Sequence, residues 1–295
     1  MTKLKICAAL AGVALSFGMI GTASAFVINA GEIKFTIDNY DAGTVDYGDT
    51  SGLKCSTVAA CDAVPGITTA PGAIGSEDTW GIFSVALIEN ITTAQTLFTK
   101  GVDGFLTGIF YGLEDKAVEV QCGLTGCNTT ALAVGGKVDM YLNTTDYNPN
   151  PNGDNDGPGG RIGSSGYESI TDIGGALYLS ADFATEVNGV SLGYTYLNFF
   201  NNTSFAGNGQ GFLDVTGGSA ASLFDTNALA DPVGGLHDLF LTVTFDDVNS
   251  AASSIGWTVT SAGQVKGEVN IPEPGTLALV GLGLVGAGFL RRRKS

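Results

Sequence analysis

Strict alternation of apolar and polar residues is the feature that most constrains the fold of this 295-residue chain. From Asp238 to Asp246 every second residue is apolar, at Leu239, Leu241, Val243 and Phe245, and the polar residues Thr242 and Thr244 lie between them. Side chains of a β-strand point alternately to opposite faces, so this period of two predicts a strand with one buried face. The same pattern recurs at residues 137–143 and at Ile255, Trp257 and Val259.

Further candidate strands are separated by turn-forming pairs such as Asn208-Gly209. They lie at residues 27–37, 80–91, 105–111, 176–183, 190–199 and 212–215. Only short helical turns are expected between them, near residues 92–97 and 220–229. Roughly ten short strands without a long amphipathic helix predict an all-β fold, an antiparallel β-sandwich or jelly-roll-like domain.

The first 25 residues have the pattern of a secretory signal peptide. Lys3 and Lys5 supply a positive start, residues 6–20 form an apolar helix, and Ala23 and Ala25 form a small-residue cleavage site. An uncleaved N-terminal transmembrane helix is the alternative, which the closeness of the cleavage site disfavours. We therefore expect a signal peptide at 1–25, a secreted β-domain at 26–270 and a separate tail at 271–295.

The tail contains three parts in a fixed order. Pro272, Glu273 and Pro274 form a rigid, extended motif, because each proline fixes φ and restricts the residue before it. The sixteen residues 275–290 carry no charge. As a helix they would be about 24 Å long, slightly short of a ~30 Å hydrocarbon core, and they predict a transmembrane segment. The segment ends, as the positive-inside rule expects, in a basic cluster of Arg291, Arg292, Arg293 and Lys294.

These three parts resemble the PEP-CTERM sorting signal of exopolysaccharide-producing Gram-negative bacteria. The resemblance implies recognition by a membrane protease of the exosortase type, removal of the tail and release to the cell surface or extracellular matrix. An ordinary membrane anchor that is never processed is the alternative. Residues 25–29 and 80–83 also look like flocculation-associated members of this group, which implies a role with exopolysaccharide in floc or biofilm formation.

The segment between the two termini is strongly acidic. The whole chain has a formal net charge of −16, and residues 26–271 contain seven basic and twenty-eight acidic residues, a net charge of −21. Such a charge repels nucleic acid and favours solubility and divalent cations. We therefore exclude nucleic acid as a partner, and an acidic polysaccharide could be bound only through bridging cations or neutral sugar contacts.

Four cysteines follow the signal peptide. Cys55 and Cys61 are separated by five residues, and Cys122 and Cys127 by four. An even number of cysteines in an oxidising compartment predicts disulfides, and the close spacing favours two local bridges among three possible connectivities. A zinc site is disfavoured because His237 is the only histidine.

Residues 146–160 contain no aliphatic side chain and predict a surface loop. Within this loop, Asn152, Asp154 and Asp156 imitate the first half of a calcium-binding loop, in which alternate oxygens converge on the ion. The acid expected at the twelfth position is missing, since Glu168 comes five residues too late. The sequence leaves two interpretations, a low-affinity Ca²⁺ site and a plain solvated loop.

No residue pattern predicts catalysis. A Ser-His-Asp triad would have to use His237, yet the chain has no Gly-x-Ser-x-Gly turn. Tyr194 and Tyr196 are the aromatic pair expected to be exposed for stacking on sugar rings, although most aromatic side chains should fill the core. We predict a non-enzymatic matrix protein without a cofactor. A carbohydrate-binding module is the alternative, and a secreted polysaccharide hydrolase is the second.

Overall fold

The computed structural model describes residues 32–43, 79–123, 126–153, 156–187, 193–201, 206–247 and 250–269. These residues form an antiparallel all-β fold, as the alternation predicts. Several predicted features lie outside the described residues: the signal peptide with Ala23 and Ala25, Cys55, Cys61, Asp154, the Pro272-Glu273-Pro274 motif and the basic cluster at 291–294.

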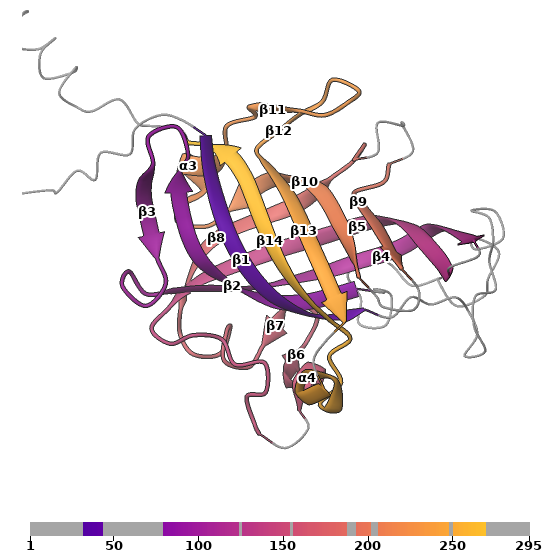
Figure 1. The fold of residues 1–295 in the computed structure, drawn as a ribbon. Helices are drawn as coiled ribbons and strands as arrows, with labels where there is room; N and C mark the ends of the chain where they lie inside the picture. The colour runs from indigo at the N-terminus through magenta and orange to yellow at the C-terminus, as the bar shows by residue number, and fades with distance from the viewer. Residues whose placement is uncertain are drawn as a thin grey trace, which may run out of the picture.

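The long strands form a closed barrel (Figure 1). The ring closes because the first strand pairs with both the second and the last. Neighbours in the ring also follow one another along the chain, which is the arrangement of an up-and-down barrel. In order, the strands are β1 (Glu32–Gly43), β2 (Thr79–Asn90), β4 (Phe105–Gly123), β5 (Gly126–Asn143), β8 (Ala176–Ala184), β10 (Gly207–Gly217), β13 (Leu239–Asp247) and β14 (Val259–Glu268).

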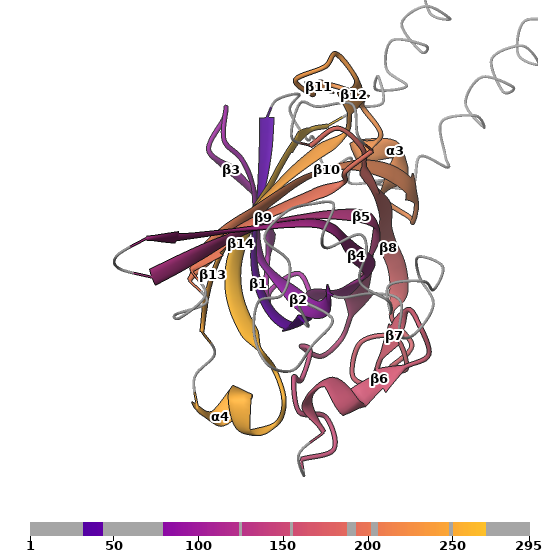
Figure 2. The same cartoon turned by 90° about the vertical axis from the view of Figure 1, so that its right-hand side faces the viewer.

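The barrel differs from the sandwich or jelly roll expected from the sequence. Alternation specifies one buried face for each strand, and both architectures satisfy that requirement. What distinguishes them is the pairing of β1 with β2 and β14, which leaves one continuous sheet instead of two facing sheets. Figure 2 shows the resulting ring of strands.

Shorter elements decorate the barrel. The helical turn expected near 92–97 is instead a turn followed by a strand, whereas the one near 220–229 is confirmed as α3. The minor elements are β3 (Gln95–Thr99), η1 (Gly157–Gly160), β6 (Arg161–Ile162), β7 (Gly166–Tyr167), β9 (Tyr196–Asn201), α3 (Ala221–Phe224), β11 (Leu229–Ala230), β12 (Leu236–His237) and α4 (Ser250–Ser254). Within the described ranges, none of the helices has the length and apolar content needed to cross a bilayer.

Packed side chains fill the barrel interior. The four apolar residues of β13 named above are buried, which confirms the predicted face. Some inward positions must be glycine: a Cβ on Gly209 would lie 2.1 Å from the hydroxyl oxygen of Tyr196. Tyr196 is therefore an interior residue and not the exposed one that the sequence suggested, while Tyr194 is half-buried and Phe199 is exposed.

A second hydrophobic core lies outside the barrel wall. Residues 144–175 follow β5 and supply Tyr167 and Ile170, which pack against the outer faces of β2 and β4. Trp257 joins them from the segment before β14. Its indole ring lies 5.6 Å from that of Trp80 and 6.0 Å from the Tyr167 ring. The strand predicted at Ile255 and Trp257 therefore begins only at Val259, because Trp257 packs in this outer cluster.

The β4–β5 hairpin extends beyond the barrel (Figures 1 and 2). Beyond the end of β8, β9 pairs with both β5 and β10 and continues the sheet into this extension. Near the tip of the hairpin, Cys122 and Cys127 are direct register partners and form a disulfide. One of the two predicted bridges is thus confirmed.

Candidate functional site

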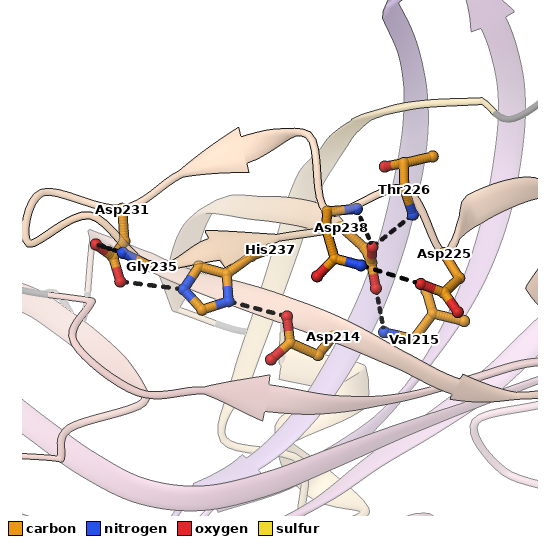
Figure 3. Close-up of polar contacts among 9 residues, drawn as sticks. Asp214, Val215, Asp225, Thr226, Asp231, Gly235, His237 and Asp238 are labelled. Carbon is orange, nitrogen blue, oxygen red and sulfur yellow. Dashed lines mark hydrogen bonds and ion pairs between the residues drawn. The ribbon is translucent and has the colours of Figure 1, made fainter.

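A buried polar network lies on the outer wall of the barrel, where residues 218–238 cross it between β10 and β13 (Figure 3). Asp238 anchors this segment and is 2% exposed. Its carboxylate accepts hydrogen bonds from three backbone N–H groups, those of Val215 (2.7 Å), Thr226 (2.6 Å) and Asn227 (2.7 Å). Charged acceptors make stronger hydrogen bonds than neutral ones, so Asp238 ties the crossing segment to β10.

His237 connects two carboxylates in the same network. Its Nδ1 lies 2.9 Å from Asp214 Oδ1 on β10, and its Nε2 lies 3.2 Å from Asp231 Oδ2 (Figure 3). The ring of Phe212 covers the imidazole at a centroid distance of 5.1 Å. A neutral imidazole has a single N–H donor, so only the imidazolium form can donate to both carboxylates. Both ring nitrogens of His237 therefore face a carboxylate.

Asp231 organises the turn between β11 and β12. Its Oδ1 accepts hydrogen bonds from the backbone N–H groups of Val233 (2.8 Å), Gly234 (2.6 Å) and Gly235 (2.8 Å). Burial raises the pKa of Asp231, but the hydrogen bonds from His237 and from these backbone groups lower it, and the net shift is downward. The carboxylate therefore remains ionised and can hold His237.

A row of polar side chains continues from this network around the outer wall. Asp214 is the register partner of Asp182 on β8, and Asp182 is the partner of Lys137 on β5. The Lys137 ammonium lies 2.7 Å from Asp182 Oδ1. Two carboxylates directly opposite one another destabilise a sheet, and here each of them has a further partner: Lys137 beside Asp182 and the His237 ring beside Asp214.

Tyrosines border the other end of this row. Tyr111 is the register partner of Lys137, and its hydroxyl donates to Asp139 Oδ2 at 3.0 Å. Ser180 donates to the other oxygen of Asp139. Burial, followed by the nearby Asp139 carboxylate, raises the pKa of Tyr111, so its hydroxyl stays protonated and acts as a donor. Tyr141 lies on the same face and is half-buried.

Protein donors already hold most of the acidic side chains in this part of the outer wall. The carboxylates of Asp139, Asp231 and Asp238 are already engaged by protein donors. In the described part of the chain, no three His, Cys, Asp or Glu side chains converge as metal ligands would. The outer wall instead offers hydroxyl groups, carboxylates and tyrosine rings in regular register.

The loop chosen as a calcium candidate is held in place by its neighbours. The Asn152 side-chain amide donates to Glu168 Oε2 at 2.6 Å, so folding places beside Asn152 the acid that the sequence spaced too far away. Asp156 is half-buried directly before η1, and Asp154 lies outside the described residues. The calcium site therefore stays a prediction.

Sequence reasoning missed the His237 network because its members are dispersed. Asp214 precedes His237 by 23 residues and Asp231 precedes it by six. The only local clue was the Asp231-Pro232-Val233-Gly234-Gly235 stretch, whose composition predicts an Asp-capped turn. Nothing in that stretch indicates which side chain would meet the carboxylate.

Comparison with known families adds information about the tail alone. The model of the PEP-CTERM protein-sorting motif matches residues 270–294. The chain carries a PEP-CTERM sorting motif. This motif indicates an exported protein, held transiently in the membrane and processed by an exosortase. No curated protein and no solved structure gives a significant match to the chain.

Proposed function

We propose that this protein is a non-enzymatic component of the extracellular matrix of a Gram-negative bacterium, delivered by its PEP-CTERM tail and retained among exopolysaccharide. The observation that carries the proposal is the sorting motif, which begins immediately after the barrel.

The outer wall has the chemistry needed to contact a glycan. Sugar hydroxyls both donate and accept hydrogen bonds, and the row from Tyr111 to Asp214 presents carboxylates and hydroxyl groups at regular spacing. The net charge of residues 26–271 limits the choice of glycan: a neutral polysaccharide binds directly, and an acidic one requires bridging divalent cations. Floc or biofilm cohesion follows from such contacts if many copies occupy one polymer.

The delivery step is tested by comparing three forms of the protein in strains with and without exosortase. The forms are the full chain, a truncation lacking Pro272 to Ser295, and Pro272→Ala/Pro274→Ala, which keeps the apolar segment. We expect the full chain to lose its tail and reach the matrix only with exosortase, and the double variant to stay in the membrane. Intact mass and cell fractionation report both outcomes. An unprocessed full chain in both strains would contradict the proposal.

A carbohydrate-binding module is the second candidate, favoured by Tyr111 and Tyr141 beside Asp139 on the outer wall. Stacking on a sugar ring requires an aromatic face, so Tyr141→Ala should weaken binding to purified exopolysaccharide, whereas Phe199→Ala on β9 should not. Titration in the presence and absence of Ca²⁺ distinguishes direct contacts from bridged ones. Depolymerisation of the polysaccharide by the protein would instead support the hydrolase alternative.

A further inference from the structure

The start of β1 and the finish of β14, which lead to the two termini of the chain, lie at the same end of the barrel. β1 begins at Glu32, which is the register partner of Glu268 at the end of β14. We name this the exit end. It also carries α3 and the β11–β12 hairpin, while α4 lies at the opposite end (Figures 1 and 2).

The sorting motif is tethered very closely to the exit end. Val269 follows β14 and is 7% exposed, so the folded barrel extends to this residue. Pro272 comes three residues later. The uncharged segment begins at Gly275, six residues after Val269, and six extended residues span at most about 22 Å. While that segment is held in a membrane, the exit end therefore stays within about this distance of the lipid surface.

Four of the nine large apolar side chains that are exposed among the described residues lie in connections at this end. Val102 in the turn after β3 is 79% exposed, and Leu236 and Val233 of the β11–β12 hairpin are 57% and 48% exposed. Ile91, which is 39% exposed, donates its backbone N–H to the carbonyl oxygen of Glu32. Side chains of this kind at one end of a barrel are typical of a surface that contacts apolar material.

The exit end also has an apolar hollow. A cavity of about 240 Å³ is lined there by side chains that include Ile88, Phe98, Phe224 and Val269. The nearby charges have both signs: Glu32 and Glu268 are paired in register, as are Lys34 and Lys266 two positions further in, and the Asp103 carboxylate accepts the Thr99 N–H at 2.8 Å. A zwitterionic headgroup, which also carries both signs, is the lipid partner that matches such a rim.

We infer that the exit end is a docking surface for a zwitterionic lipid bilayer, on which the rim of Ile91, Val102, Val233 and Leu236 rests while the tail holds the protein. The barrel then stands with its axis towards the membrane and with the His237 network just above the lipid. This inference rests on the membrane-held stage of the proposed function. Removal of the tail ends the tethering and leaves the rim too weakly bound to retain the protein.

The test uses the full chain in phosphatidylcholine vesicles, with a fluorescent coumarin amino acid introduced at Val102, Leu236 or, as the control at the opposite end, Ser253. The lipids carry bromine near the acyl carbonyl, so only a probe that enters the interface is quenched. We expect at least a twofold loss of fluorescence at Val102 and Leu236 and no loss at Ser253. Co-flotation with the vesicles is measured first for every variant.

Three results separate the possibilities. Protein that does not co-float contradicts the membrane-held stage itself. Co-flotation with equal quenching at all three positions, or with none, overturns the docking surface. A fourth variant, labelled at Val102, carries twenty Gly and Ser residues between Val269 and Asn270. Quenching that persists at Val102 shows that the rim binds lipid by itself. Complete loss of quenching shows proximity without docking and also overturns the inference. Circular dichroism confirms that each variant is folded.

Discussion

The indole Nε1 of Trp257 donates a hydrogen bond of 2.9 Å to the carbonyl oxygen of Pro149, which lies 108 residues earlier in the chain. The same carbonyl accepts a hydrogen bond from the Tyr167 hydroxyl at 3.0 Å. These bonds fix the start of the Asn- and Pro-rich loop against the outer aromatic cluster. A segment whose composition predicts only a solvated loop thus contributes to a second core.

Two substitutions of Trp257 should separate the contribution of its ring to stability from that of its hydrogen bond. Trp257 is 1% exposed, so Trp257→Ala should lower the free energy of unfolding by about 3–5 kcal/mol. Trp257→Phe keeps an aromatic ring but loses the donor to Pro149, and a loss of about 1–3 kcal/mol is expected. Urea unfolding followed by circular dichroism measures both. Equal losses in the two variants would mean that the ring contributes little beyond the hydrogen bond.

Asp238→Ala should destabilise the barrel strongly. The substitution leaves three backbone N–H groups, of Val215, Thr226 and Asn227, without their charged acceptor, and the expected loss is about 3 kcal/mol. As a control, Asp246 lies on the exposed face of β13, so Asp246→Asn should change the free energy of unfolding by less than about 0.5 kcal/mol. Thermal unfolding of both variants tests the difference, and similar midpoints would contradict the anchoring role of Asp238.

Gly235→Ala should disturb the His237 network without removing any of its members. A Cβ at this position would lie 2.4 Å from Asp231 Oδ2 and 3.2 Å from His237 Nε2, so the carboxylate would have to move. The matched control is Gly159→Ala, because a Cβ on Gly159 meets nothing within 4 Å. We expect a lower unfolding midpoint for Gly235→Ala alone, with the histidine ring resonances shifted in NMR spectra. Unchanged resonances would show that the turn absorbs the extra methyl group.

Stability should fall as pH rises towards neutrality because of Asp41. Burial raises the pKa of its carboxyl from 3.8 to about 7, although the hydrogen bond from Asn39 opposes the shift. Between about pH 4 and pH 7 the folded state therefore holds a proton that the unfolded state has lost. The resulting stability is present at low pH and is lost as pH rises through about 7. Asp41→Asn should flatten this part of the pH profile in urea titrations, whereas exposed Asp246→Asn should preserve it.

Loss of the Cys122–Cys127 disulfide should have a modest effect. The bridge joins register partners near the tip of a hairpin and closes a loop with a sequence separation of only five. Short loops restrict the unfolded chain least, so Cys122→Ser/Cys127→Ser should lower the free energy of unfolding by about 2 kcal/mol or less. Hydrogen exchange should show the change at the hairpin tip, and faster exchange throughout the barrel would contradict this local role.

Local pattern predicted much of the strand content. The period-two stretch at Leu239 to Phe245 became the inward face of β13 because a strand with one apolar side has few other stable arrangements. The same rule wrongly predicted a strand at Trp257, since the ring of this residue packs outside the barrel wall. Tyr196 was misjudged for a related reason: the Gly209 position that accommodates its hydroxyl lies on another strand.

The sequence by itself determined the features that depend on neighbouring residues: the sorting motif, the all-β character and the bridge between Cys122 and Cys127. Tertiary structure alone decided that β1 pairs with both β2 and β14, that Asp214 and Asp231 meet His237, and that Ile91, Val102, Val233 and Leu236 are exposed in connections at the exit end. The physical reason is the range of the interactions. Backbone preference and alternation act over a few residues, whereas barrel closure and polar networks depend on register between strands far apart in the chain.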